Sequence, residues 1–116
     1  MLLTIAIPTY KRCKYAVQNV KYLLPQVLAH QDSVSLLVTD NHSEDGTFEE
    51  LSVLANRYKE VFTLYEQEKN IGWMNNFFFG IEHSDSEFVF LLGDDDIVSP
   101  NFLDIVLPIL KNGGEN

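Results

Sequence analysis

Three consecutive carboxylates, Asp94, Asp95 and Asp96, are the densest group of chemically active side chains in the sequence. They follow the apolar run Phe88-Val89-Phe90-Leu91-Leu92, which is typical of a strand buried in a sheet. Adjacent carboxylates repel one another, so they destabilise a fold unless a cation offsets their charge. Mg²⁺ and Mn²⁺ prefer oxygen ligands, and Mg²⁺ usually binds one or two carboxylates together with substrate phosphates. The sequence therefore predicts a divalent-cation site; the alternative is an acidic turn that caps the next helix, which would explain one or two of the aspartates.

Polar side chains also follow the other runs that have strand character. They are Thr9, Tyr10, Lys11 and Arg12 after the first run, Asp40, Asn41 and Ser43 after the second, and Lys69, Asn70 and Gly72 after the third. In an open parallel sheet, ligands bind outside the carboxyl ends of the strands, where the strand order reverses. We therefore expect these residues to share one functional edge with the aspartates. The alternative is that they are the ordinary polar residues of surface loops.

The elements that must position these residues alternate between short apolar runs and helical stretches. We expect strands over 2–7, 34–38, 61–65 and 88–92, and helices over 15–29, 48–58, 74–81 and 102–110. Pro25 should kink or break the first helix, and Thr47 with Glu50 should form a capping box on the second. The alternation predicts an α/β fold of one domain, residues 1–116, with a mainly parallel, doubly wound sheet and helices on both faces.

The composition and the missing motifs exclude several classes of function. Asp and Glu number 17 against 8 Lys and Arg, and a net charge of −9 disfavours binding to nucleic acid. The single cysteine, Cys13, has no recognisable catalytic partner, and it fits a reduced cytosolic setting. His30, His42 and His83 lack the spacing of a zinc site. No glycine-rich phosphate loop follows the first strand, so a phosphate would be held by a metal ion and side chains.

Three runs of residues together resemble the family 2 glycosyltransferases, whose donor-binding region has the Rossmann-like GT-A fold. The runs are Ile7-Pro8-Thr9-Tyr10-Lys11-Arg12, Thr39-Asp40-Asn41-His42-Ser43-Glu44-Asp45-Gly46-Thr47 and Leu92-Gly93-Asp94-Asp95-Asp96-Ile97-Val98-Ser99-Pro100. Between the second and third runs, the stretch from Asn70-Ile71-Gly72 through Asn76 is most similar to one branch of the family. That branch adds sugars to bacterial surface polysaccharides and includes abequosyltransferase-like enzymes.

The resemblance implies an enzyme that transfers a sugar from a nucleotide-diphosphate sugar to a saccharide or lipid-linked acceptor in surface polysaccharide synthesis. It implies that Pro8, Thr9 and Tyr10 line the base and ribose, and that Asp40 or Asn41 hydrogen-bonds the base. The expected donor-binding residues are Pro8, Thr9, Tyr10, Arg12, Asp40, Asn41, Asn70, Asn76 and Asp94. The expected metal ligands of the DxD-type element are Asp94, Asp95 and Asp96, with Asp95 the first choice for Mg²⁺ or Mn²⁺.

Two other classes of function stay open beside the enzyme. One is a non-catalytic nucleotide-binding or assembly module. The other is an aspartate-based phosphotransfer domain, which ranks last because no suitable lysine follows a strand. For an enzyme, the resemblance implies that the general base lies beyond Asn116, and that the protein acts in the cytoplasm, at the inner face of the cell membrane when full-length. The resemblance also implies that the chain lacks the C-terminal half that binds the acceptor. The surface that this half would cover is expected to be hidden in a homodimer.

The sequence also departs from the family pattern. Phe77-Phe78-Phe79 stands where many members carry Arg-Asn, and we expect these rings to pack in the core. Asp40-Asn41 stands where many members have paired aspartates, which leaves open a base other than uracil because an amide both donates and accepts. Trp73, beside Gly72, has two interpretations, a packing residue or a platform for a sugar or base. Arg12 either pairs with a diphosphate or is a solvated surface arginine.

Overall fold

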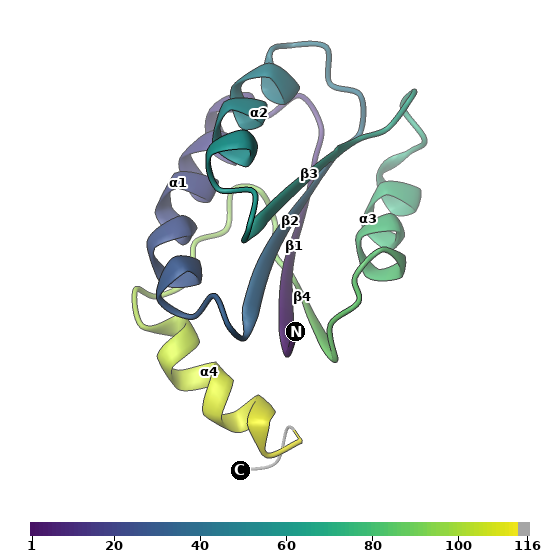
Figure 1. Ribbon diagram of the computed structural model, residues 1–116. Coiled ribbons are helices and arrows are strands. Elements are labelled where there is room, and N and C mark those ends of the chain that lie inside the picture. Colours follow the sequence, from purple (N-terminus) through teal and green to yellow (C-terminus); the bar gives the residue numbers. More distant parts are fainter. Residues whose placement is uncertain (114–116) are drawn as a thin grey trace.

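Four parallel strands form the centre of the molecule in the computed structural model, which describes residues 1–113 (Figure 1). They are β1 (Leu3–Thr9), β2 (Val34–Asp40), β3 (Phe62–Glu66) and β4 (Phe88–Leu91). Their order is β3-β2-β1-β4, so the sheet grows outward from β1 to β3 and then reverses to place β4 on the other side of β1. This reversal lies at the carboxyl end of β1, where sheets of this kind bind their ligands.

Helices cover both faces of this sheet (Figure 1). They are α1 (Cys13–Ala29), α2 (Thr47–Arg57), α3 (Trp73–Glu82) and α4 (Phe102–Lys111). The first two lie together on one face, and α3 packs alone on the other, against β1 and β2. The expected fold class, an α/β sheet with parallel strands and helices on both faces, is confirmed.

The core lies mainly around the two central strands. Ile5 and Ile7 of β1 and Val38 of β2 are fully buried, because helices cover β1 and β2 on both sides. The expectation of a buried strand over 88–92 is only partly met, since the four residues of β4 are half-buried and only Leu92 after it is buried. The reason is that β4 pairs with β1 alone among the described residues and forms the edge of the sheet.

The structure differs from two expectations about the helices. Pro25 was expected to kink or break α1, and the break is absent: α1 runs through Pro25 because Leu24 and Val27 on either side are buried against the core. Packing there outweighs the roughly 3 kcal/mol that an internal proline costs. The capping box is absent: α2 begins at Thr47 itself, after Gly46 in the left-handed conformation, and the carboxylate of Asp45 accepts the Thr47 backbone N–H.

The three phenylalanines of α3 do not enter the core, contrary to the expectation. The face of α3 that meets the sheet carries Asn76 and Gly80, both buried, and a Cβ at Gly80 would just touch Ala6 of β1. Successive helical residues point about 100° apart, so Phe77, Phe78 and Phe79 cannot share that face. The buried contacts of α3 with β1 and β2 are therefore made by small and polar residues.

The aromatic rings of α3 instead occupy three different surroundings. Phe79 stacks on His83 with 3.7 Å between ring centroids and lies 4.4 Å from the Tyr65 ring of β3. Phe78 is 47% exposed, and Phe77 is half-buried beside the cavity described below. Three large apolar side chains on the outer side of α3 are exposed: Met74, Phe78 and Ile81. Trp73, at the start of α3, is also exposed, but it lies in the lining of the cavity.

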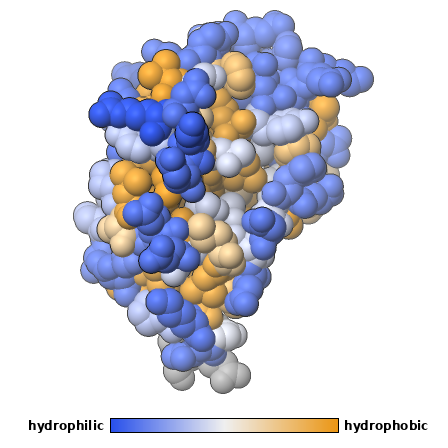
Figure 2. Space-filling model, viewed as in Figure 1, coloured by the Kyte–Doolittle hydropathy of each residue, from blue (hydrophilic) through white to orange (hydrophobic). Residues whose placement is uncertain are grey.

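The surface shown in Figure 2 carries hydrophobic residues in patches that hydrophilic residues interrupt. Within residues 1–113, no helix is both long and apolar enough to cross a bilayer.

Candidate functional site

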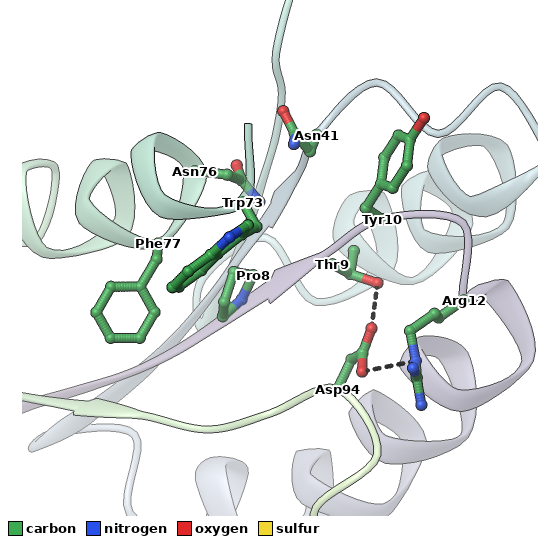
Figure 3. A pocket seen from close by; sticks show the side chains of 9 residues that line it. All are labelled: Pro8, Thr9, Tyr10, Arg12, Asn41, Trp73, Asn76, Phe77 and Asp94. Carbon is green, nitrogen blue, oxygen red and sulfur yellow. Dashed lines mark hydrogen bonds and ion pairs between the residues drawn. The ribbon is translucent and has the colours of Figure 1, made fainter. Parts of the chain in front are cut away.

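A cavity of about 180 Å³ opens at the carboxyl end of β1 (Figure 3). Its lining residues come from the ends of β1 and β2, from α3 and from the loop after β4: Pro8, Thr9, Tyr10, Arg12, Asn41, Trp73, Asn76, Phe77 and Asp94. Every expected donor-binding residue except Asp40 and Asn70 lines this cavity, and Trp73 and Phe77 join them. The structure thus brings together side chains from four separate segments at the point where the strand order reverses.

The register of the sheet places the acidic loop beside β1. Ala6 of β1 pairs with Leu91 of β4, so Thr9 and Asp94 lie equally far along their two segments. The Thr9 hydroxyl donates a hydrogen bond of 2.8 Å to Oδ2 of Asp94. Leu92 extends the pairing by one bond to the carbonyl of Ala6 before the loop turns away.

One arginine offsets the charge of two of the aspartates. Arg12 Nε lies 3.1 Å from Oδ1 of Asp94, and its Nη2 donates to Oδ2 of Asp95 at 2.8 Å. Asp94 is 8% exposed, and burial raises its pKa, while the Thr9 hydroxyl and the Arg12 guanidinium oppose that rise. Arg12 is thus exposed but ion-paired: its side chain is 45% exposed, and its guanidinium faces two carboxylates.

The third aspartate does not join this group. Asp96 is exposed, and its carboxylate lies against Gly93, where a Cβ atom would come within 2.5 Å of Oδ2. Among residues 1–113, no three His, Cys, Asp or Glu side chains gather into a cluster that could by itself hold a metal ion. Asp94 and Asp95 alone converge on one cationic group, and a cation placed there would need further ligands from a substrate.

Asn19 of α1 holds the acidic loop in place, and it is not among the site residues expected from the sequence. This side chain is 3% exposed, and its amide nitrogen donates 2.8 Å to the carbonyl of Asp96. The signal was available, because Asn19 is a polar residue on the helix face that carries Ala16 and Val20. A buried amide on an apolar face needs a partner, and here that partner is the backbone of the loop.

Asp40 lies behind the cavity rather than in it. It is fully buried, its Oδ1 accepts the Ser43 hydroxyl at 2.5 Å, and its Oδ2 has no hydrogen-bond partner among residues 1–113. Burial raises the pKa of Asp40, and the hydrogen bonds from Ser43 oppose that rise. The Ser43 hydroxyl oxygen also accepts the backbone N–H of Lys11, which has a φ of 54°. Asp40 thus anchors the strained loop that carries Tyr10 and Arg12.

A network of amides sets the turn before α3. The Asn41 side chain donates to Oδ1 of Asn70 and accepts the backbone N–H of Ile71, both at 2.9 Å. The same oxygen of Asn70 accepts the Gly72 N–H at 2.8 Å. Gly72 has φ 87° and ψ 151°, a backbone conformation that essentially only glycine adopts. Trp73 follows directly and projects over the cavity beside Pro8 (Figure 3).

Asn76 fastens α3 to the sheet beneath this turn. It is 2% exposed, its amide nitrogen donates to the carbonyl of Thr39 at 2.9 Å, and its oxygen accepts from the Gln67 amide at 3.3 Å. The amides of Asn41 and Asn76 thus bond to the protein, and they shape the wall of the cavity from those positions.

Cys13 lies apart from the cavity lining, at the start of α1. Its thiol donates to the Glu50 carboxylate, and burial together with Glu50 raises its pKa to about 11. At neutral pH the thiol is protonated and poorly nucleophilic. This agrees with the interpretation of Cys13 as a passive residue.

The chain matches known proteins over nearly its whole length. Residues 4–116 match the family model described as Glycosyl transferase family 2. The abequosyltransferase RfbV of Salmonella typhimurium is 27% identical over 112 residues, which make up 97% of this chain and 33% of that protein. The chain therefore spans about a third of the length of this curated relative.

Solved structures share the fold. The mannosyltransferase PcManGT of Pyrobaculum calidifontis, in complex with GDP-Man and Mn²⁺, matches with a TM-score of 0.78 at 20% identity, over 90% of this chain and 31% of that one. TarS 1–349 of S. aureus, in complex with UDP-GlcNAc, matches with a TM-score of 0.76 at 21% identity, over 97% of this chain and 32% of that one. These glycosyltransferases confirm the expected GT-A type of sheet. The family model matches residues 4–116, which include every residue that lines the cavity. This protein therefore belongs to glycosyl transferase family 2.

Proposed function

We propose that this chain binds the donor of a glycosyltransferase that moves a sugar from a nucleotide-diphosphate sugar to a saccharide or lipid-linked acceptor in surface polysaccharide synthesis. The observation that carries the proposal is the cavity at the end of β1, where an apolar wall faces a charged one. Family membership and the similarity to an abequosyltransferase support it. So do the nucleotide sugars bound by the two structural neighbours.

The charged wall suits the diphosphate end of such a donor. Asp94 and Asp95 offer oxygen ligands to one divalent cation, and the Arg12 guanidinium between them marks a place where positive charge is favourable. The residues fit Mg²⁺ or Mn²⁺ if phosphate oxygens complete the shell. When bound, such a cation would stabilise the negative charge on the leaving nucleoside diphosphate.

The protein's own groups would orient this end of the donor. The Thr9 hydroxyl holds Oδ2 of Asp94 by its hydrogen bond, so Oδ1 of Asp94 faces Arg12. Asn19 fixes the backbone of the same loop, which limits how far the carboxylates can move. Arg12 can turn one or more of its N–H groups to phosphate oxygens, a geometry for which guanidinium groups are well suited.

We also propose a second copy of the chain as a partner. Met74, Phe78 and Ile81, the exposed apolar residues on the outer side of α3, support this proposal, because large uncovered apolar patches are uncommon on monomers. The non-catalytic binding or assembly module remains the alternative to the enzyme, and it would use the same cavity.

The test is calorimetric titration of UDP, CDP, GDP and dTDP with and without Mn²⁺. We expect at least one nucleotide to bind more tightly with the metal. Asp95→Ala should remove most of that gain, whereas Asp96→Ala, a matched change on the exposed neighbour, should retain it. If no nucleotide binds more tightly with Mn²⁺ than without it, the acidic loop has no metal-binding role. Because the general base is expected beyond Asn116, this chain should not transfer sugar to an acceptor. Slow hydrolysis of a bound nucleotide-diphosphate sugar is the activity that separates the enzyme from the binding module.

A further inference from the structure

We propose that Trp73 is the platform on which the nucleobase of the donor stacks, and that Asn41 and Asn70 hold it in place for that purpose. The inference rests on the proposed function, because it assigns the apolar wall of the same cavity. Trp73 is 73% exposed, although indole is the largest side chain in the lining. Burying such a ring is among the most favourable contacts a ligand can gain.

The cavity has two chemically different sides (Figure 3). Trp73 and Phe77 from α3 lie on one side, with Pro8 beneath the indole, and Arg12 with Asp94 lies on the other. The volume of about 180 Å³ is smaller than the roughly 300–1,000 Å³ of a typical ligand site. The cavity therefore takes one ring of the donor at the apolar side, while the phosphates extend toward the charged side.

A base fits the apolar side better than a sugar does. The side-chain amides of Asn41 and Asn76 are hydrogen-bonded to the protein at both nitrogen and oxygen, which leaves few free groups for the hydroxyls of a sugar. A sugar placed there would lose hydrogen bonds to water without regaining them. The faces of a nucleobase carry no hydrogen-bonding groups, so they can cover the indole at no such cost.

The position of Trp73 is set before any ligand arrives. Asn41 bonds both Asn70 and the backbone of Ile71, and the glycine-only conformation of Gly72 fixes the direction in which the chain enters α3. Asn41 is thus a positioning residue, acting on the base through Trp73. A platform held in this way loses little conformational freedom on binding, which favours affinity.

Trp73 is the only tryptophan of the chain, so its fluorescence reports directly on this wall. We would titrate the protein with UMP, CMP, GMP and AMP, exciting at the red edge of indole absorption, and compare glucose 1-phosphate, which has a phosphate but no base. We expect saturable quenching by at least one nucleotide and none by the sugar phosphate. Calorimetry on the same solutions gives the affinity independently of the fluorescence.

Two variants separate stacking from mere apolar bulk. Trp73→Leu should weaken binding of the quenching nucleotide by roughly 5- to 150-fold in calorimetry, the range for loss of one base–aromatic stack. Trp73→Phe should restore most of the affinity. Phe78→Leu, on the same helix but outside the cavity, is the matched control and should bind as the unchanged protein does. Asn41→Ala should lower the fluorescence anisotropy of Trp73 without nucleotide and weaken binding, as a positioning role requires.

The outcomes distinguish this inference from the function on which it rests. Nucleotide binding in calorimetry with unchanged Trp73 fluorescence, together with normal binding by Trp73→Leu, overturns the stacking role and leaves the proposed function intact. Quenching by glucose 1-phosphate but by no nucleotide also overturns it, because the wall then takes a sugar. If neither the nucleoside monophosphates nor the diphosphates with Mn²⁺ bind, the proposed function and this inference fall together.

Discussion

The buried hydrogen bond from Thr9 to Asp94 gives the sharpest test of how the site is held together. Thr9→Val keeps the shape of the side chain and removes the hydroxyl. A hydrogen bond to a charged group contributes about 1.5–3 kcal/mol. Arg12 cannot replace it, since its side chain is 45% exposed and an ion pair at such a position contributes at most about 1 kcal/mol. We therefore expect the variant to lose about 1.5–3 kcal/mol of unfolding free energy at pH 7.

The pH dependence of this loss follows from the direction of the pKa shift. Burial already raises the pKa of Asp94, and removing the Thr9 hydroxyl, which opposes the rise, should raise it further. The pKa of the unfolded chain is unchanged, so the variant loses stability relative to the parent as the pH rises through the folded pKa. Below that pKa the carboxyl is protonated, and the loss should shrink to the roughly 0.5–1.5 kcal/mol of a neutral hydrogen bond.

The assay is urea unfolding followed by circular dichroism at pH 7 and at a pH near the ordinary carboxyl range. Thr9→Ser is the matched control, because it keeps the hydroxyl and loses only a methyl group, a cost that does not depend on pH. The reasoning is refuted if Thr9→Val lies within about 0.5 kcal/mol of Thr9→Ser at pH 7, a difference within the usual scatter of additive effects. A penalty that grows as the pH falls would refute the assigned direction of the pKa shift.

Three further predictions concern the acidic loop, the turn before α3 and the outer side of α3. Asp94→Asn should make the unliganded protein more stable at pH 7, because the raised folded pKa of Asp94 means that its charged form is disfavoured there. This gain in stability should vanish below the ordinary aspartate pKa of 3.8, and thermal unfolding at pH 7 and below pH 3.8 checks it. Gly72→Ala should cost about 1–3 kcal/mol through backbone strain and should loosen Trp73, which unfolding and anisotropy measure; a neutral effect would contradict the assigned conformation. Sedimentation should show a dimer that forms with rising concentration, and Phe78→Ser should weaken it about tenfold; a single monomeric species at all concentrations would exclude the second copy as partner.

The fold could be predicted from the sequence because its signals are local. The four apolar runs end at Thr9, Asp40, Glu66 and Leu91, close to where their flanking turn residues indicated. Parallel strands place their carboxyl ends at one edge, so the polar residues that follow them were expected to meet, and most of them line one cavity.

The directions of individual side chains could not be predicted in the same way. Phe77, Phe78 and Phe79 are of a residue type common in protein cores. Only the register of α3 on the sheet decides that Asn76 and Gly80 face the sheet instead. This register depends on how closely two backbones approach, which is a property of the packed pair of elements and not of the helix sequence alone.

The hydrogen-bond partners of individual side chains could not be predicted from the sequence either. Asn41 is an obvious donor and acceptor in the sequence, yet its partners are Asn70 and Ile71, about thirty residues away, rather than groups of a ligand. Asp96 has the same chemistry as Asp95, and its different direction depends on the space beside Gly93. Residue type limits what a side chain can do, and the fold decides which of those options is used.

The guanidinium that bridges Asp94 and Asp95 has a consequence for how an anionic ligand would reach the cavity. The chain carries a net charge of −9, so at a distance it repels a nucleotide diphosphate. Arg12 neutralises the entrance only locally, over less than the Debye length of about 8 Å at physiological ionic strength. Encounter would therefore be unassisted by long-range attraction and would become more frequent, not rarer, as added salt screens the repulsion. Selectivity in such a protein comes from contacts made after the encounter. Ligands would therefore be distinguished by slow dissociation rather than by fast association.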